Sequence, residues 1–355
     1  MISLTLRSIG FLGRITVGAK RGDVAKRLSA LVCILALGGA VMPAASEQPV
    51  MAPADEPIAP IPTAIDLDPA KVRLGERLFR DARLSHDNTV ACTSCHQLDN
   101  GGDDGQAHSI GADGRPLDFN APTVFNAALS FQLNWRGNFR TLEEQAEAVL
   151  LDPRLMATSW QELIPKLRTD PTYMEAFLAS YGRSPAPPQV LDALAAFQRS
   201  LITPDAPFDR YLRGDSDAID PEQKHGYELF KSYGCIACHQ GVNIGGNLYE
   251  RFGIFHNPFA HHLVTDADLG RFTITGSPKD RFVFRVPSLR NVAATAPYFH
   301  DGSAATLEQA VEEMARDQLG KVLAPQDIHF IVRFLHTLTG KYGDRPVADR
   351  VDVEP

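Results

Sequence analysis

Cysteine and tryptophan are scarce in this 355-residue chain, and acidic residues outnumber basic ones. Each of these features excludes some classes of protein. There are five cysteines and two tryptophans, and 43 acidic residues oppose 35 Lys and Arg, for a net charge of −8. A chain this acidic is a poor match for a phosphate backbone, so we expect no nucleic-acid partner. The hydrophobic content of 44% is ordinary for a globular protein, and the length allows roughly two domains.

Long apolar runs are also missing beyond the first 46 residues. Within that stretch, six basic residues precede the apolar run Leu28 to Met42, and small residues follow it. This order is typical of an export signal, and about 15 apolar residues are few for a membrane span. We therefore expect a signal over residues 1–46, a periplasmic protein and no stable membrane span, with an uncleaved anchor as the alternative. Because the signal carries six basic residues and one Asp, its removal changes the net charge from −8 to −13.

The four cysteines outside the signal form two Cys-x-x-Cys pairs, and a histidine follows each pair directly. The motifs are CTSCH at 92–96 and CIACH at 235–239. Two disulfides or a zinc site would use the cysteines but leave the adjoining histidines unexplained. Cys-x-x-Cys-His is the attachment motif of c-type haem, so we predict two covalently bound haem c groups. The predicted attachment residues and proximal iron ligands are Cys92, Cys95, His96, Cys235, Cys238 and His239.

Sequence blocks around the two motifs repeat along the chain. GERLF (75–79) precedes the first motif and GYELF (226–230) precedes the second. APTVFN (121–126) matches VPSLRN (286–291), and GNFRTLEEQA (137–146) matches GSAATLEQA (302–310), and both pairs begin at an offset of 165 residues. Self-similarity of this kind indicates that each half of the chain builds the same unit. We therefore predict two cytochrome c-type haem domains in tandem.

Helical patterns dominate the rest of the sequence. The first helix is predicted to begin at Pro69, with Asp68 as its N-cap. Apolar residues recur at three- and four-residue spacing over 188–201 and over 324–340, where Gly340 is the predicted C-cap. Strand-like alternation is scarce, apart from a short ribbon predicted from RFTITG (271–276) and RFVFRV (281–286). The predicted fold class is mostly α with little β.

The second axial iron ligand distinguishes the two halves. Met314, on a predicted helix after the repeated Thr-Leu-Glu block, is the candidate ligand of the second haem, with core packing as the alternative. The offset of 165 residues places Val149 at the corresponding position, and valine cannot bind iron. We therefore predict an open first haem that binds peroxide, and a Met-ligated second haem whose raised potential suits electron storage. The same offset pairs His300 with Trp135, a candidate electron relay or a buried core indole.

Taken in order, several motifs resemble those of the bacterial di-haem cytochrome c peroxidases, a family that includes the MauG-type enzymes. They are LGERLFRDARLS, CTSCH, NAPTVFNAA, FDRYLRGD, GCIACH, GGNLYERFG, FRVPSLRNVAATAPYFHDG and MARDQLGK, within residues 65–342. The resemblance implies reduction of hydrogen peroxide to water at the N-terminal haem. It also implies that a small cytochrome c or cupredoxin supplies electrons to the C-terminal haem, and that the protein is a homodimer.

The resemblance also implies roles for single residues. Met314 would complete the second haem, Trp135 would lie between the haems, and Gln145 would orient peroxide. A calcium ion is implied between the domains, and its ligands would be Asn120, Thr295 and Pro297. A hard cation prefers oxygen ligands, so the last two would contribute backbone carbonyls. His300 would lie near a haem propionate.

The expected organisation follows from the repeat and the resemblance together. An export signal (1–46) and a proline-rich tether (47–64), disordered or extended, precede the folded part. The N-terminal peroxidatic haem c domain spans 65–205 and the C-terminal electron-transfer haem c domain spans 206–342. Residues 343–355 form a tail.

Two positions depart from the family pattern. In many members a loop histidine ligates the peroxidatic haem at rest, and that position is Ala112 here. His108, four residues earlier, is the candidate substitute, but we favour its interpretation as a solvated loop residue. The distal acid is replaced by Leu155. An acid that moves a proton to the leaving oxygen contributes about 10²–10⁴-fold in rate, so this replacement puts fast turnover in question. Asp152 and Glu147 are the candidate substitutes, with surface or capping roles as the alternative.

Three functions therefore stay open at this point. The first is a peroxidase, and the second is MauG-like oxidation of a partner protein. The third is a non-enzymatic di-haem electron-transfer cytochrome. Met314 argues against a close MauG analogy, because a tyrosine takes the place of the methionine ligand there.

Overall fold

The computed structural model describes residues 56–260 and 263–347, and most of its regular structure is helical. The predicted mostly α class with little β is confirmed, and the predicted signal lies outside the described residues. The helices are α1 (Pro69–Phe79), α2 (Cys92–Cys95), α3 (Leu142–Leu151), α4 (Trp160–Thr169), α5 (Pro171–Tyr181), α6 (Pro187–Ser200), α7 (Pro207–Leu212), α8 (Pro221–Tyr233), α9 (Phe272–Thr275), α10 (Leu307–Leu319) and α11 (Pro325–His336). Among the described residues, none of these helices combines the length and apolar character that crossing a membrane requires.

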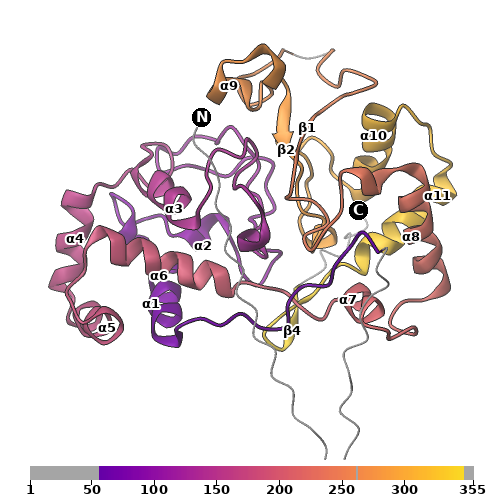
Figure 1. The fold of residues 1–355 in the computed structure, drawn as a ribbon. Helices are drawn as coiled ribbons and strands as arrows, with labels where there is room; N and C mark the ends of the chain where they lie inside the picture. The colour runs from indigo at the N-terminus through magenta and orange to yellow at the C-terminus, as the bar shows by residue number, and fades with distance from the viewer. Residues whose placement is uncertain (1–55, 261–262, 348–355) are drawn as a thin grey trace, which may run out of the picture. The chain divides into compact units, whose positions relative to one another are not determined.

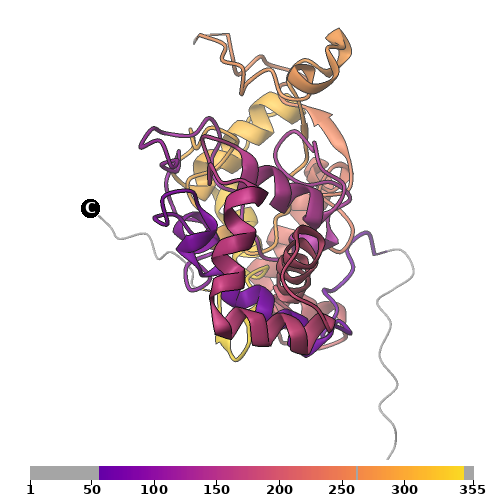
Figure 2. The same cartoon turned by 90° about the vertical axis from the view of Figure 1, so that its left-hand side faces the viewer.

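The described part contains two small antiparallel ribbons. β1 (Tyr249–Arg251) pairs with β2 (Val283–Arg285), and β3 (Lys341–Tyr342) pairs with β4 (Arg345–Pro346). The ribbon predicted from RFTITG and RFVFRV is half wrong. RFVFRV does contain β2, but RFTITG forms the helix α9, which Gly276 ends at φ 65°. α9 lies beside β1 and β2 in Figure 1 and, seen from the side in Figure 2, stands away from the other helices.

Helix starts were predicted better than helix ends. α1 begins at Pro69, and the Asp68 side chain accepts a hydrogen bond from the N–H of Ala70 at 2.8 Å. The helix predicted to end at Gly340 instead ends at His336. Gly340 has a different role, because a Cβ atom there would lie 2.0 Å from the carbonyl oxygen of Thr203. The glycine is needed where two segments of the chain cross.

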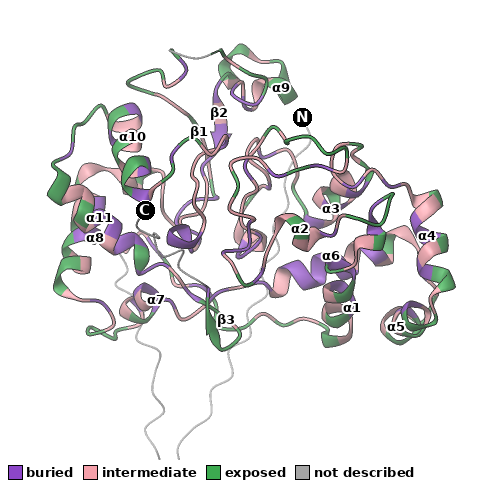
Figure 3. Cartoon of the chain, turned by 180° about the vertical axis from the view of Figure 1, so that it is seen from behind, coloured by how far each residue is buried: buried purple, intermediate pink, exposed green. Residues whose placement is uncertain are grey.

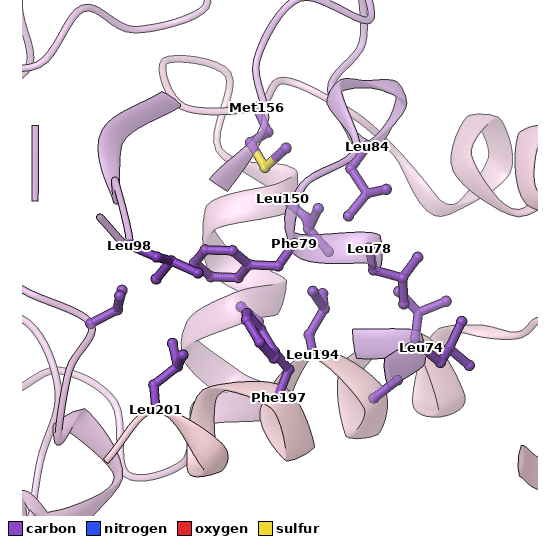
Figure 4. Close-up of a cluster of buried hydrophobic side chains, with 14 of the residues drawn as sticks. Leu74, Leu78, Phe79, Leu84, Leu98, Leu150, Met156, Leu194, Phe197 and Leu201 are labelled. Atoms are coloured by element: carbon purple, nitrogen blue, oxygen red, sulfur yellow. The ribbon is translucent and has the colours of Figure 1, made fainter. Parts of the chain in front are cut away.

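Buried apolar side chains form two main clusters, one for each half of the chain. The first lies between α1, α3 and α6, where Phe79 and Phe197 meet at a ring-centroid distance of 5.2 Å (Figure 4). The second gathers around Phe208, Tyr227 and Phe334 from α7, α8 and α11. Figure 3 shows that the buried residues of α6 form an almost continuous stretch, which fits a helix packed on several sides.

The two halves repeat each other in space as they do in sequence. Gly75 lets α1 cross α6 closely, since a Cβ atom there would lie 1.9 Å from the carbonyl oxygen of Ala193. Gly226 does the same where α8 crosses α11, at 1.9 Å from the carbonyl oxygen of Phe330. Single antiparallel bridges follow the offset of 165 residues as well, with Leu133 opposite Phe139 and Tyr298 opposite Ala304.

A buried polar junction joins the halves at Thr203. Its hydroxyl accepts hydrogen bonds from the side-chain amides of Asn126 at 2.8 Å and of Asn291 at 3.0 Å. These asparagines are 165 residues apart, and both adopt the left-handed conformation, at φ 58° and 60°. The N–H of Thr203 donates to Asn126, and the N–H of Gly340 donates to Asn291 in the matching way. We call Asn126, Thr203, Asn291 and Gly340 the Thr203 junction.

The end of the proline-rich segment is packed more firmly than a free tether. Residues 56–64 form no helix or strand, but Ile58 and Ile61 are buried, and the carbonyl of Ala59 accepts a hydrogen bond from Arg290 at 2.8 Å. Arg290 also forms a fully buried ion pair with Asp209 at 2.7 Å. Figure 1 shows this indigo segment passing α7 on its way to α1. Its apolar residues and backbone carbonyls, rather than any periodicity, fix its course.

The Thr203 junction predicts a stability difference between two substitutions. Thr203→Val keeps the side-chain shape but leaves both asparagine amides without their acceptor, which should lower the free energy of unfolding by about 1–3 kcal/mol. Thr203→Ser keeps the hydroxyl and loses one methyl group, at a cost of about 1 kcal/mol or less. Urea unfolding followed by helical circular dichroism measures both. A valine variant at least as stable as the serine variant would contradict this account.

Candidate functional site

One cavity of about 610 Å³ brings the two Cys-x-x-Cys-His motifs together. Its wall includes the first motif, on α2, and the second, which follows α8. All four cysteines are free thiols, so no disulfide joins these described residues. Burial raises the pKa of Cys92 to about 12 and that of Cys235 to about 11, which keeps these two thiols protonated. The cavity wall therefore carries both cysteine pairs and both histidines that covalent attachment of a porphyrin needs.

The two motif histidines are prepared to bind a metal. The Nδ1 atom of His96 lies 3.2 Å from the carbonyl oxygen of Gly102, and Nδ1 of His239 lies 3.2 Å from that of Ile244. Because a carbonyl only accepts, Nδ1 carries the proton in each ring and the lone pair is left on Nε2. Burial lowers the pKa of His96, and it lowers that of His239 to about 4, so both imidazoles are neutral near pH 7. A neutral imidazole is the form that ligates iron.

The difference between Met314 and Val149 is kept in three dimensions. Met314 lies on α10 and Val149 on the corresponding helix α3, and both line the cavity. Both side chains are half-buried, and Val149 also packs against the first apolar cluster. Equivalent helices thus present a thioether in one half and a branched alkyl group in the other.

The wall formed by α3 and the loop after it is short of acids. Leu155 and Gln145 both line the cavity. Of the two candidate substitutes for the missing acid, Asp152 lines the cavity while also accepting a hydrogen bond from the N–H of Arg154 at 2.8 Å. Glu147 instead accepts a hydrogen bond from the indole of Trp160 at 2.9 Å and is not part of the cavity wall. The structure therefore favours Asp152 over Glu147.

Arg154 connects this wall to the loop that carries Ala112. The N–H of Ala112 donates to the carbonyl of Arg154 at 3.1 Å. The Arg154 guanidinium bonds to Asp118 at 2.6 Å and to the carbonyl of Pro116 at 2.9 Å. His108 does not line the cavity, although its buried Nδ1 atom has no hydrogen-bond partner in the described part of the chain.

Trp135 and His300 lie side by side at the cavity wall. Their rings are 6.5 Å apart in an edge-to-face arrangement, and His300 is bonded through Nε2 to Asp268 at 2.8 Å. The indole N–H of Trp135 donates to the backbone carbonyl of Asn120 at 2.8 Å. Phenylalanines, including Phe284 at 4.7 Å, surround His300. Trp135 packs beside this aromatic cluster and also lines the cavity.

The three residues predicted to bind calcium also line this cavity. Asn120, Thr295 and Pro297 all line the cavity. The amide nitrogen of Asn120 donates to the carbonyl of Gln106 at 2.8 Å, which leaves the amide oxygen available. No N–H group in the described chain donates to the carbonyl of Thr295 or Pro297. These oxygens are of the kind that Ca²⁺ prefers.

Sequence reasoning missed three polar residues at this site. Arg136 and Arg285 line the cavity on either side of Trp135, and Asp268 is the partner of His300. Arg136 directly follows Trp135, and Arg285 lies in FRVPSLRNVAATAPYFHDG, one of the motifs that resemble the family. Both neighbours already pointed to this part of the site. Asp268 lies 32 residues before His300 in irregular chain, where no periodicity connects them.

Comparison with known proteins gives one consistent family. The model of the di-haem cytochrome c peroxidase domain matches residues 69–217. The chain is 45% identical over 289 residues to the cytochrome c peroxidase Ccp of Escherichia coli, covering 81% of this chain but only 62% of that protein. It is 39% identical to the cytochrome c551 peroxidase of Nitrosomonas europaea, covering 82% of this chain and 86% of the relative.

MauG-type proteins also match. The methylamine utilization protein MauG of Methylorubrum extorquens is 34% identical over 71% of this chain and 70% of its own length. Among solved structures, a MauG-like protein associated with microbial copper homeostasis superimposes with a TM-score of 0.70 at 29% identity, over 81% of this chain and 95% of that chain.

The contacts of Arg154 predict that it restrains the loop at 109–118. Arg154→Met should speed amide hydrogen exchange of Gly111 and Ala112 by about two- to fivefold, since an exposed ion pair contributes at most about 1 kcal/mol. Arg115→Met is the matched control, because it removes an ion pair with Asp113 inside the same loop. Equal exchange in the two variants, read by mass spectrometry, would show that Arg154 has no such role.

Proposed function

The chain belongs to the di-haem cytochrome c peroxidase family, and from this membership we propose that it is a periplasmic di-haem c-type peroxidase that reduces hydrogen peroxide to water. A small cytochrome c or cupredoxin supplies the two electrons, and two protons complete the reaction to two water molecules. The observation that carries the proposal is the pair Val149 and Met314. Equivalent helices present a methionine side chain to one half of the cavity and a valine to the other.

The residues that hold the cofactors follow from the two motifs. Two haem domains in tandem, at 65–205 and 206–342, each attach one haem c through their cysteine pair. When bound, the haems supply one iron with a free position for peroxide and a second that exchanges electrons with the donor. Nε2 of His96 and of His239 would bind the two irons, because Nδ1 of each ring is bonded to a carbonyl. Met314 would supply a further ligand to the iron held by His239.

The side chains on the open side position peroxide and move its proton. The amide of Gln145 orients the peroxide by hydrogen bonding, but an amide does not titrate. Leu155 excludes water and cannot transfer a proton. Asp152 is the remaining carboxyl group on this wall of the cavity, and we assign it the proton transfer that the family's distal acid performs. A group in such a role contributes about 10²–10⁴-fold to the rate.

The region between the two motifs serves electron transfer. Trp135 is the relay, held by its hydrogen bond to the carbonyl of Asn120. Asn120, Thr295 and Pro297 would hold a calcium ion through oxygen atoms, and Asn120 would then bond to the ion and to the indole at once. Held in this way, Asn120 would position the relay.

Steady-state turnover tests the proposed reaction. The protein with both haems attached should oxidise reduced cytochrome c only when peroxide is present, with two cytochromes oxidised for each peroxide. Haem content is measured separately by the pyridine haemochrome spectrum. Fully loaded protein that oxidises no donor in response to peroxide would contradict the proposal.

The acid assignment predicts unequal effects of two similar substitutions. Asp152→Asn should lower kcat by about 10²-fold, because the amide cannot transfer a proton. Glu147→Gln is the matched control five residues earlier, on α3, and it should stay near the wild-type rate because Glu147 bonds to Trp160. Equal losses in both variants, or no loss in either, would rule out Asp152 as the proton carrier.

Oxidation of a partner protein is the second candidate, and Leu155 is the observation that favours it. A slow peroxide reaction gives time for oxidising equivalents to leave through Trp135 to a docked substrate. Mass shifts in a protein expressed together with this chain, dependent on peroxide, would support it. A purely electron-transferring cytochrome is distinguished by its spectrum, since it requires both irons to be six-coordinate and low-spin, whereas the peroxidase shows a high-spin ferric signal.

A further inference from the structure

Two arginines, Arg285 buried and Arg136 half-buried, lie next to Trp135 on the cavity wall. Arg136 follows the tryptophan in the chain, and the backbone N–H of Arg285 donates to the carbonyl of Trp135 at 2.9 Å. Both arginines line the cavity. They come from different halves of the sequence and meet only in the folded protein.

Arg285 carries a charge that the protein leaves uncompensated. Its residue exposure is 7%, and its guanidinium reaches only two acceptors in the described chain, the carbonyls of Asn134 at 3.1 Å and Val286 at 3.4 Å. A guanidinium has five N–H donors. No described carboxylate forms an ion pair with it. Burial lowers the pKa of Arg285 to about 10, so the group is still cationic at neutral pH.

Arg136 is in a similar position. Burial lowers its pKa, and its guanidinium donates to the hydroxyl of Thr273 at 2.8 Å while lying over the ring of Phe119. The acid that acts on it is Asp118, which is itself bonded to Arg154 at 2.6 Å. Arg136 therefore has no carboxylate of its own among the described residues.

Another buried arginine shows how this protein treats such a charge elsewhere. Arg290 is fully buried and forms a 2.7 Å ion pair with the equally buried Asp209. Placing an unpaired charge in the interior has a large desolvation cost, so native proteins pair such groups or use them to bind a ligand. Arg136 and Arg285 face a cavity instead of an acid, which indicates that an anionic ligand pairs with their positive charges.

We propose that Arg136 and Arg285 form a carboxylate-binding site beside Trp135, and that the carboxylates they bind are the propionate groups of haem c. This inference rests on the proposed binding of haem in the cavity. A planar guanidinium binds a carboxylate with two parallel hydrogen bonds. Two positive charges stabilise the reduced state of a nearby iron, so the arginines raise its reduction potential as well as anchoring the porphyrin next to Trp135.

Redox titration of the loaded protein tests the site without relying on turnover. In Arg285→Gln the midpoint potential of one haem should fall. The ratio of reduced to oxidised haem at a fixed potential should drop at least tenfold, which corresponds to about 59 mV for a one-electron couple. Arg136→Gln should lower a midpoint in the same direction. Arg285→Lys keeps the charge and should retain most of the wild-type potential.

Arg271→Gln is the matched control. It removes the same charge close by, from a side chain that lies 3.8 Å over the ring of Tyr249 and bonds to the carbonyl of Arg136 but does not line the cavity. Its midpoints should stay near those of the wild type. A shift in Arg271→Gln equal to that in Arg285→Gln would mean a general charge effect and would overturn the proposal.

Two further outcomes separate this inference from the function on which it rests. Two attached haems with unchanged midpoints in both Arg285→Gln and Arg136→Gln would overturn the carboxylate site and leave the peroxidase proposal standing. Wild-type protein that binds no haem would overturn both. Midpoints of the wild type that move with added inorganic phosphate, while those of Arg285→Gln do not, would identify a free anion in place of the propionates and refute the assignment.

Discussion

The Thr203 junction is the constraint on which the rest of the structure depends. One hydroxyl accepts from two asparagines that occupy the same place in the two halves, and each asparagine is held in the left-handed conformation by this bonding. The carbonyl of Asn126 also accepts from Asn243, which lies just after the second haem motif. The segments leading into both asparagines, 119–125 and 286–289, line the cavity. A change at this single point would therefore move both walls of the site.

The repeat supplies the same scaffold twice, and function comes from the positions where the copies differ. Gly75 and Gly226 allow the same close crossing of helices, so the backbones of the halves correspond. On that common frame, a valine stands opposite a methionine and Trp135 stands opposite His300. Such pairs change what reaches the cavity without changing how the chain folds. Two haem sites of different chemistry then follow from side chains alone.

Much of this arrangement was predictable from the sequence because its signals are local or repeat at a fixed offset. The haem motifs, the N-cap at Asp68 and the pairing of Val149 with Met314 are of this kind. Gly340 was misassigned as a helix cap because a glycine needed for a close crossing looks the same in sequence. RFTITG was misassigned because four residues in a tight helix leave too short a pattern. Contacts such as His300 with Asp268 join irregular segments, and no spacing rule reaches them.

The distal side of the first half shows why the two departures from the family pattern belong together. The backbone N–H of Ala112 is bonded to the carbonyl of Arg154, next to Leu155. Under the proposed function, a methyl side chain at Ala112 offers no ligand that must leave the iron before peroxide binds, so the acid need not move with this loop. Asp152 follows α3 as its C-cap and lines the cavity from that end of the helix.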